Sequence, residues 1–209
     1  MKKKKIKFLF IIFLLSSLFL IKPVFSGSQE DTSFESGARQ KSIGFEEKNR
    51  DSILVLRKRF IKDIEKNNIQ NIKEFLKNNG PDINFIVSHI HPFVHAANIN
   101  NFELVKFFLN ESEINIDAID ELGDTALIKA SEKGNIEIVN YLINNNADIN
   151  YQNQQGLTPA MKAAERNNLH VFKLLLDKNV DITKSDYTGR TLKEIAENSR
   201  DKRILKLLN

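Results

Sequence analysis

The chain has 209 residues, enough for one domain of ordinary size, and a formal net charge of +4 at pH 7. Residues 1–26 contain six lysines and no acidic residue, so the remainder of the chain carries a net charge of −2. This balance removes the main argument for nucleic-acid binding, which needs a basic surface on the folded part, and we predict no nucleic-acid partner. The absence of cysteine excludes disulfides and thiolate chemistry.

Residues 1–26 have the layout of a signal peptide. Lysines at 2–5 and 7 precede an uninterrupted apolar run at 8–21, and Ser26 ends a segment suited to cleavage. The run is shorter than the roughly 20 apolar residues of a membrane-spanning helix. We therefore predict export through a Sec-type signal, with cleavage after Ser26, to the periplasm or the medium. The alternative is an uncleaved segment that tethers the chain to the inner membrane.

Residues 27–50 are polar and show no sustained period, so we predict a flexible linker there. The pattern changes at residue 51, where apolar residues begin to recur at three- and four-residue spacing, as they do along one side of a helix. The residues of this predicted apolar side are Ile53, Leu54, Leu56, Phe60, Ile61 and Ile64.

The rest of the chain repeats itself at a fixed interval. Similar tripeptides begin at positions 82, 115, 148 and 181, which gives a period of about 33 residues. Ala130, Ala163 and Ala196 keep the same interval, while Ala96 lies one residue further from Ala130, and the extra residue fits into the loop at 111–114. A fixed period of this length predicts stacked units, because one helix pair cannot bury its own apolar face but adjacent copies cover one another.

Each unit reads as a short helix, a tight turn, a second helix and a loop. Thr158 and Pro159 suit the start of the first helix, where threonine caps free amides and proline is tolerated. Asn167-Asn168 predicts the turn between the helices. Asn179 predicts the end of the second helix, because asparagine adopts the left-handed conformation more readily than most residues.

The stretches TALIKA (125–130), TPAMKA (158–163), HPFVHA (91–96) and TLKEIA (191–196), spaced by this period, resemble ankyrin repeats. The resemblance covers about residues 57–209. It implies an all-α solenoid of stacked helix pairs with short hairpin loops, in which residues 51–209 form four to five repeats including both caps. The histidine of the family signature is replaced by Val94, Ile128, Met161 and Glu194, so we expect apolar contacts at this position between repeats.

The resemblance also implies that another protein binds to the concave face formed by the hairpin tips and the first helices. On this face we predict partner contacts at Phe85, Val87, Ser88, Ile119, Glu121, Leu122, Asp124, Glu132, Lys133, Gln152, Gln154, Gln155, Leu157, Glu165, Arg166, Ser185, Tyr187 and Arg190.

Three histidines at 89, 91 and 95 are spaced so that they could converge on zinc. However, Pro92 follows His91 directly, and His91 holds the capping position that threonine occupies in the other units. We therefore expect capping or surface roles and predict no metal site.

Catalytic motifs are absent from the sequence. It contains no Gly-rich phosphate loop and no G-x-S-x-G element, and the acidic pair Glu46-Glu47 falls in the predicted linker. We therefore predict a monomeric binding protein that is not an enzyme and uses no cofactor, with no membrane contact beyond an uncleaved N-terminal segment. The composition, rich in Lys, Ile and Asn, together with the export signal favours a bacterial source. A second hypothesis is that the repeats regulate or protect a periplasmic enzyme.

Overall fold

The computed structural model describes residues 50–79 and 82–208. The predicted signal peptide and the linker up to residue 49 lie outside these ranges, and residue 50 is already helical. Within the described ranges the secondary structure is helical, with isolated β-bridges in hairpins and no strand. The all-α class predicted from the period is therefore confirmed.

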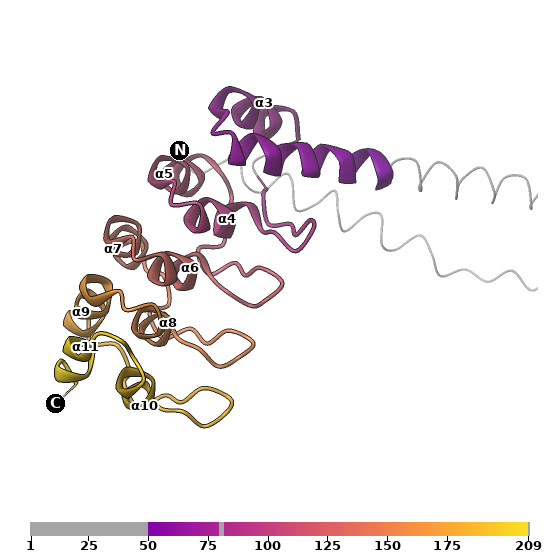
Figure 1. Ribbon diagram of the computed structural model, residues 1–209. Helices are drawn as coiled ribbons and strands as arrows, with labels where there is room; N and C mark the ends of the chain where they lie inside the picture. Colours follow the sequence, from indigo (N-terminus) through magenta and orange to yellow (C-terminus); the bar gives the residue numbers. More distant parts are fainter. Residues whose placement is uncertain (1–49, 80–81, 209) are drawn as a thin grey trace, which may run out of the picture. The chain divides into compact units, whose positions relative to one another are not determined.

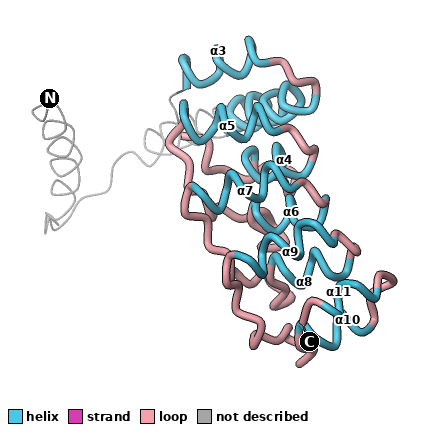
Figure 2. Tube along the Cα trace, turned by 90° about the vertical axis from the view of Figure 1, so that its left-hand side faces the viewer, coloured by secondary structure: helices cyan, strands magenta, loops and turns pink. Residues whose placement is uncertain are grey.

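The described helices form five consecutive pairs (Figure 1). A helix at 50–65 pairs with α3 (Ile69–Asn79), α4 (Pro92–Asn98) with α5 (Phe102–Glu111), α6 (Ala126–Lys133) with α7 (Ile136–Asn144), α8 (Pro159–Glu165) with α9 (Leu169–Asp177), and α10 (Leu192–Glu197) with α11 (Lys202–Lys206). The first helices α4, α6, α8 and α10 stack in one row, and α5, α7, α9 and α11 stack in a second (Figures 1 and 2). The hairpins project from the side of the first row (Figure 1).

Threonine and asparagine set the helix boundaries. Thr125, Thr158 and Thr191 stand at the N-caps of α6, α8 and α10, where each hydroxyl accepts a hydrogen bond from the backbone N–H at the third helical position. Left-handed residues make the turn between the helices of a pair, at Gly134 with φ 77° and at Asn167 with φ 62°. The predicted helix starts and turns are confirmed at these positions.

Small residues allow the first helices to approach closely. Ala96, Ala130, Ala163 and Ala196 occupy equivalent positions in α4, α6, α8 and α10, and none of them has any exposed surface. Val94, Ile128 and Met161 are also buried, which confirms the apolar contacts expected where the family has histidine. Glu194 differs, because it is exposed and its carboxylate accepts hydrogen bonds from Thr191 in a capping box.

The second helices contribute the larger core side chains. Phe108, Leu142 and Leu175 hold equivalent positions on α5, α7 and α9, and each is fully buried. They belong to one continuous core that runs from Phe60 to Ile204. A continuous core of this kind is expected when each unit buries its apolar face against its neighbours.

The helix at 50–65 differs from the prediction in its first turns. Phe60, Ile61 and Ile64 are buried as expected, but Ile53 and Leu54 are each about two-fifths exposed. Leu56 is exposed to the same degree. The helix is much longer than the first helices of the later pairs and extends past their row (Figure 1), so its first turns have little to pack against among the described residues.

The repeated tripeptides form a polar ladder between units. Inside a tripeptide the first side chain accepts the N–H of the third residue, as when Asn150 N–H donates to Asp148 Oδ1 at 2.8 Å. The third side chain then accepts the first N–H of the next unit: Asp148 N–H donates to Asp117 Oδ1 at 3.0 Å, and Asp181 N–H donates to Asn150 Oδ1 at 2.8 Å. At the last rung, Thr183 donates its hydroxyl back to Asp181.

Candidate functional site: the hairpin surface

The candidate site consists of three hairpins and the helix ends beside them. We call it the hairpin surface and define it as the exposed side chains of 119–125, 152–158 and 185–191 together with the last turns of α6 and α8.

This definition leaves out the first hairpin, at 86–91, which is one residue shorter than the hairpin at 119–125. Val87 and Ile90 bond each other across it, whereas Asp120 bonds Asp124 in the next unit. The tip of the short hairpin is formed by Ser88 and His89, which both have positive φ. The extra residue between Ala96 and Ala130, which was expected in the loop at 111–114, therefore lies in the hairpin at 119–125.

An Asp or Asn side chain closes each of the three hairpins. Asp120 Oδ1 accepts the N–H groups of Leu122 at 3.0 Å and Asp124 at 2.9 Å. Asn153 and Asp186 make the same pair of bonds in the next two hairpins. These bonds satisfy backbone donors inside the turn and hold its shape. The closing residues were not singled out from the sequence, although their spacing follows the repeat and could have revealed them.

Neighbouring hairpins are joined by backbone hydrogen bonds. Gln154 N–H donates to the Leu122 carbonyl at 3.3 Å, and Tyr187 N–H donates to the Gln155 carbonyl at 3.0 Å. Side chains add to these links, since Gln152 Nε2 donates to the Ser185 carbonyl at 2.9 Å. The tips therefore form a connected row in which the position of one hairpin fixes the next.

Most of the predicted contact residues are accessible. The exposed ones are Ser88, Ile119, Glu121, Leu122, Lys133, Gln154, Gln155, Arg166, Ser185, Tyr187 and Arg190, and the half-buried ones are Glu132, Gln152 and Glu165. Two large side chains stand out among them, because Leu122 is 62% exposed and Tyr187 is 71% exposed at the tips of their hairpins. Neither position is required for the core.

Four predicted contact residues are buried and offer no surface to a partner in this structure. Phe85 packs against the ring of Phe60 at 6.0 Å between centroids, and Val87 and Leu157 belong to the core. Asp124 is only 3% exposed. The expectation of contacts at Phe85, Val87, Asp124 and Leu157 is corrected on this point, because the neighbouring units cover these side chains.

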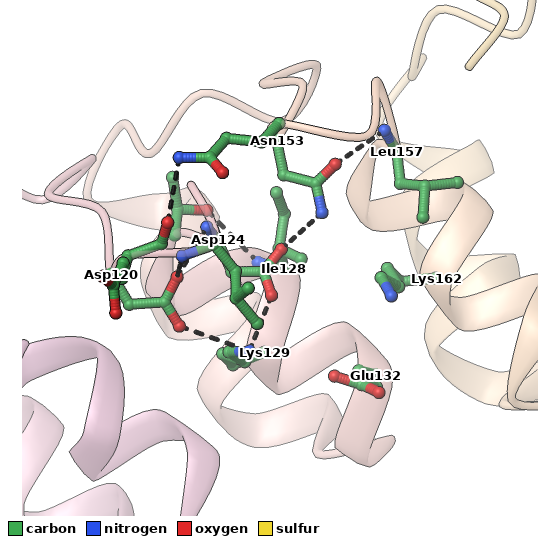
Figure 3. A network of polar contacts seen from close by, with 12 residues as sticks. Asp120, Asp124, Ile128, Lys129, Glu132, Asn153, Leu157 and Lys162 are labelled. Atoms are coloured by element: carbon green, nitrogen blue, oxygen red, sulfur yellow. Dashed lines mark hydrogen bonds and ion pairs between the residues drawn. The ribbon is translucent and has the colours of Figure 1, made fainter. Parts of the chain in front are cut away.

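Asp124 is the centre of a buried polar network (Figure 3). Its carboxylate accepts a hydrogen bond from Lys129 Nζ at 2.6 Å and another from Asn153 Nδ2, also at 2.6 Å. Asp120 Oδ2 lies 3.3 Å from the same Lys129 Nζ. Burial lowers the pKa of Lys129, but the hydrogen bond and charge of Asp124, with the charge of Asp120, outweigh it and raise the pKa above its ordinary value. The network thus fixes one hairpin to the helix behind it and to the next hairpin.

Ion pairs cross from one unit to the next along the helix ends. The Arg166 guanidinium pairs with Glu132 of the preceding unit, with Nε at 3.0 Å from the carboxylate. Arg190 pairs with Asp186 at 2.7 Å and approaches Glu165 at 3.6 Å. Although burial raises the pKa of Asp186, hydrogen bonds from Thr188 and Arg190 outweigh it and lower that pKa to about 2. The carboxylate is therefore charged at any physiological pH.

The three clustered histidines take separate environments. His91 stands at the N-cap of α4, but its side chain makes no capping hydrogen bond, and both ring nitrogens are buried without a partner. Burial lowers its pKa to about 4 despite the opposing charges of Asp120 and Asp82. His95 Nε2 lies 3.7 Å from Glu65, and the exposed His89 contacts Glu121. The expected capping role of His91 is thus met by its backbone position and not by its side chain.

Neither a metal centre nor a membrane span occurs in the described ranges. No group of His, Asp or Glu side chains in them is arranged to hold a metal ion. None of their helices combines the length and apolar character needed to cross a bilayer. The apolar run at 8–21 lies outside the described residues.

The sequence matches known proteins over most of this stack. Residues 61–153 and 145–209 match the family described as ankyrin repeats (3 copies). A segment of 59 residues is 41% identical to ankyrin repeat domain-containing protein 29 of Danio rerio. The segment amounts to 28% of this chain and 20% of that relative, so the chain spans about a fifth of the relative's length. Because the family match extends over well more than half of the chain, this protein belongs to the ankyrin repeat family.

Proposed function

We propose that this protein is exported and binds another protein through the hairpin surface, which corresponds to the concave face expected from the sequence. Ankyrin repeats bind other proteins and generally have no enzymatic activity, so family membership supports a binding role.

One observation carries the placement on the hairpin surface. Leu122 and Tyr187 expose most of their side chains on hairpins that are bonded into one row. A row of this kind is ordered before a partner arrives, so binding loses less conformational entropy than binding by free loops. Tyrosine is one of the residue types enriched among the anchors of protein interfaces.

Replacement of Leu122, Gln154 and Tyr187 together by alanine tests this placement. We expect the triple variant to lose the partner in a pull-down from the exported fraction, because both large side chains at the tips are removed. The melting temperature should stay close to that of the unmodified chain, since none of the three residues is buried. A matched triple variant of exposed residues on second helices, Glu137→Ala, Lys173→Ala and Asp177→Ala, should still capture the partner. Full capture by the hairpin variant would contradict the placement.

Export is supported by the sequence of residues 1–26 alone. N-terminal sequencing of the exported protein distinguishes the two forms proposed for it. A first residue at Gly27 supports cleavage, and a first residue at Met1 supports the tethered form. A role as regulator or protector of a periplasmic enzyme is compatible with either form, and a captured enzyme whose activity changes on binding would support it.

A further inference from the structure

At the C-terminal end of the stack, an open hollow of about 410 Å³ lies between α8 and α10. Side chains from the end of α8, from the last hairpin and from the turn after α10 line it. Those that matter here are Glu165, Arg166, Arg190, Asn198, Ser199 and Arg200. Three arginines and one glutamate therefore line this hollow.

Substitutions within the repeat produce the hollow. Glu132 and Lys133 of α6 correspond, one unit later, to Glu165 at the end of α8 and to Arg166, which caps it. In the last unit the shorter Asn198 and Ser199 take the same two positions. Long charged side chains cover the step from α6 to α8, where Arg166 reaches back to Glu132. At the step from α8 to α10 the shorter side chains leave the space unfilled.

The arginines of the hollow are held in place without using all of their N–H donors on described residues. Arg166 uses Nε and Nη2 to bond Glu132, and Arg190 uses Nε and Nη2 to bond Asp186. A guanidinium has five N–H donors. In both Arg166 and Arg190, the donors on Nη1 form no bond to a described residue. Arg200 is exposed and forms no hydrogen bond or ion pair within the described part of the chain. Glu132 and Asp186, which do not line the hollow, thus hold Arg166 and Arg190 in place, and Arg190 also lies 3.6 Å from Glu165, which does line it. Among the described residues Arg200 has no such partner.

A carboxylate is the group that this arrangement fits. Guanidinium groups bind carboxylates through paired N–H donors, and a guanidinium already held in place loses little freedom when it does so. The hollow also continues the hairpin surface, since Arg190 belongs to the same hairpin as the exposed Tyr187. A partner lying on the tips could therefore reach it.

We propose that this hollow binds an acidic segment, rich in Asp or Glu, of the protein that occupies the hairpin surface. The inference rests on the proposed function and adds the chemical class of the partner. Binding at exposed guanidinium groups is screened by salt, so the affinity of the acidic segment falls as the salt concentration rises.

Three fluorescein-labelled peptides of equal length test the proposal with the full chain. One contains a run of glutamates, one has glutamine in their place, and one has phosphoserine. Fluorescence polarisation at low salt should show binding of the glutamate peptide and not of the glutamine peptide. In the double variant Arg166→Gln and Arg200→Gln we expect the affinity to fall about tenfold or more, which matches the loss of one or two charge-assisted contacts.

The control is the double variant Lys173→Gln and Lys178→Gln, which removes the same charge on and directly after α9, away from the hollow. Its affinity for the glutamate peptide should stay within about twofold of the unmodified chain, a change smaller than the loss of one screened surface contact. Equal losses in the two double variants, or no binding by the unmodified chain, would overturn the proposal. So would binding of the phosphoserine peptide alone, since it would identify a phosphate site.

The same variants separate this inference from the proposed function. We call the double variant Arg166→Gln and Arg200→Gln the hollow variant. If it captures the partner normally while the triple alanine variant loses it, the hollow does not bind the partner and the placement on the hairpin surface is supported. If only the hollow variant loses the partner, the acidic site stands and the placement on the hairpin tips fails.

Discussion

The hairpin at 152–158 and the hairpin at 185–191 have the same closure but different surroundings. Gly156 and Gly189 both adopt positive φ, at 76° and 87°. A Cβ atom added to Gly156 would lie 2.6 Å from the backbone nitrogen of Tyr187, whereas one added to Gly189 would meet nothing within 4 Å. The backbone conformation thus favours glycine in both hairpins, but only the inner one also has the next unit against it. At Gly156, contact with the following repeat therefore leaves no room for a side chain, a restriction that Gly189 does not have.

Alanine at these two glycines should reveal the difference most clearly. We expect Gly156→Ala to lower the free energy of unfolding by about 4 kcal/mol, because it combines an unfavourable φ with a clash against backbone. Gly189→Ala should lower it by only about 1 kcal/mol, the cost of the left-handed conformation alone. Urea denaturation of both variants measures the two values. Equal losses would show that the following repeat adds no constraint.

The pair formed by α4 and α5 extends the comparison to a helix cap. His91 lies where Thr125, Thr158 and Thr191 cap the later units, and its buried ring lacks hydrogen-bond partners. Because the folded-state pKa is about 4 and the ordinary value is near 6.5, the unfolded chain takes up the proton first as the pH falls. The stability that depends on neutral His91 is complete above about pH 6.5 and is lost progressively down to about pH 4.

We expect this loss to amount to about 3 kcal/mol, by conversion of the pKa shift into free energy. The variant His91→Thr should lack this component, and its hydroxyl should accept the N–H of Val94, the third residue of α4, as the threonines do in the later units. Denaturation of both proteins at pH values from 7 to 4 measures the difference. Both proteins contain the same carboxylates, so the pH dependence that these groups cause cancels when the two curves are subtracted. His95, whose pKa burial lowers despite the charge of Glu65, remains in both. If the free energy of unfolding changed with pH in the same way in both proteins, the low pKa of His91 in the folded chain would be contradicted.

The smallest expected effect concerns the polar ladder. Asn150 accepts the N–H of Asp181 in the next unit, while the side-chain bond of the equivalent Thr183 to a described residue stays within its own tripeptide. Asn150→Ala should therefore lower the free energy of unfolding by about 1 kcal/mol, the typical value of one hydrogen bond. Thr183→Ala should have a smaller effect, below about 0.5 kcal/mol, as expected for a surface change. A larger loss at Thr183 than at Asn150 would show that the ladder does not connect units energetically.

The sequence predicted those features that depend on one unit alone. The period located Ala96, Ala130, Ala163 and Ala196, and the turn and capping residues placed the helix boundaries. These signals are local, because a cap or a left-handed turn requires a particular residue type at one position.

Features that depend on a neighbouring unit were not predictable in the same way. Asp124 looks like an exposed loop residue until Lys129 and Asn153 enclose it, and Leu157 is covered only once the units stack. The exposed Ile53 has the spacing of a core residue, but too little of the fold lies beside it. Periodicity shows which residues share one face of a helix. Whether they are buried depends on the element that packs against that face.

The polar ladder also bears on how such a chain can change its length during evolution. Each rung joins a side-chain oxygen of one copy to a main-chain amide of the following copy, and every copy whose first residue is not proline carries that amide. If a block of one full period were duplicated or deleted in register, the bond would re-form at the new junction without any compensating mutation. The junction chemistry thus permits units to be gained or lost without loss of the bond between copies.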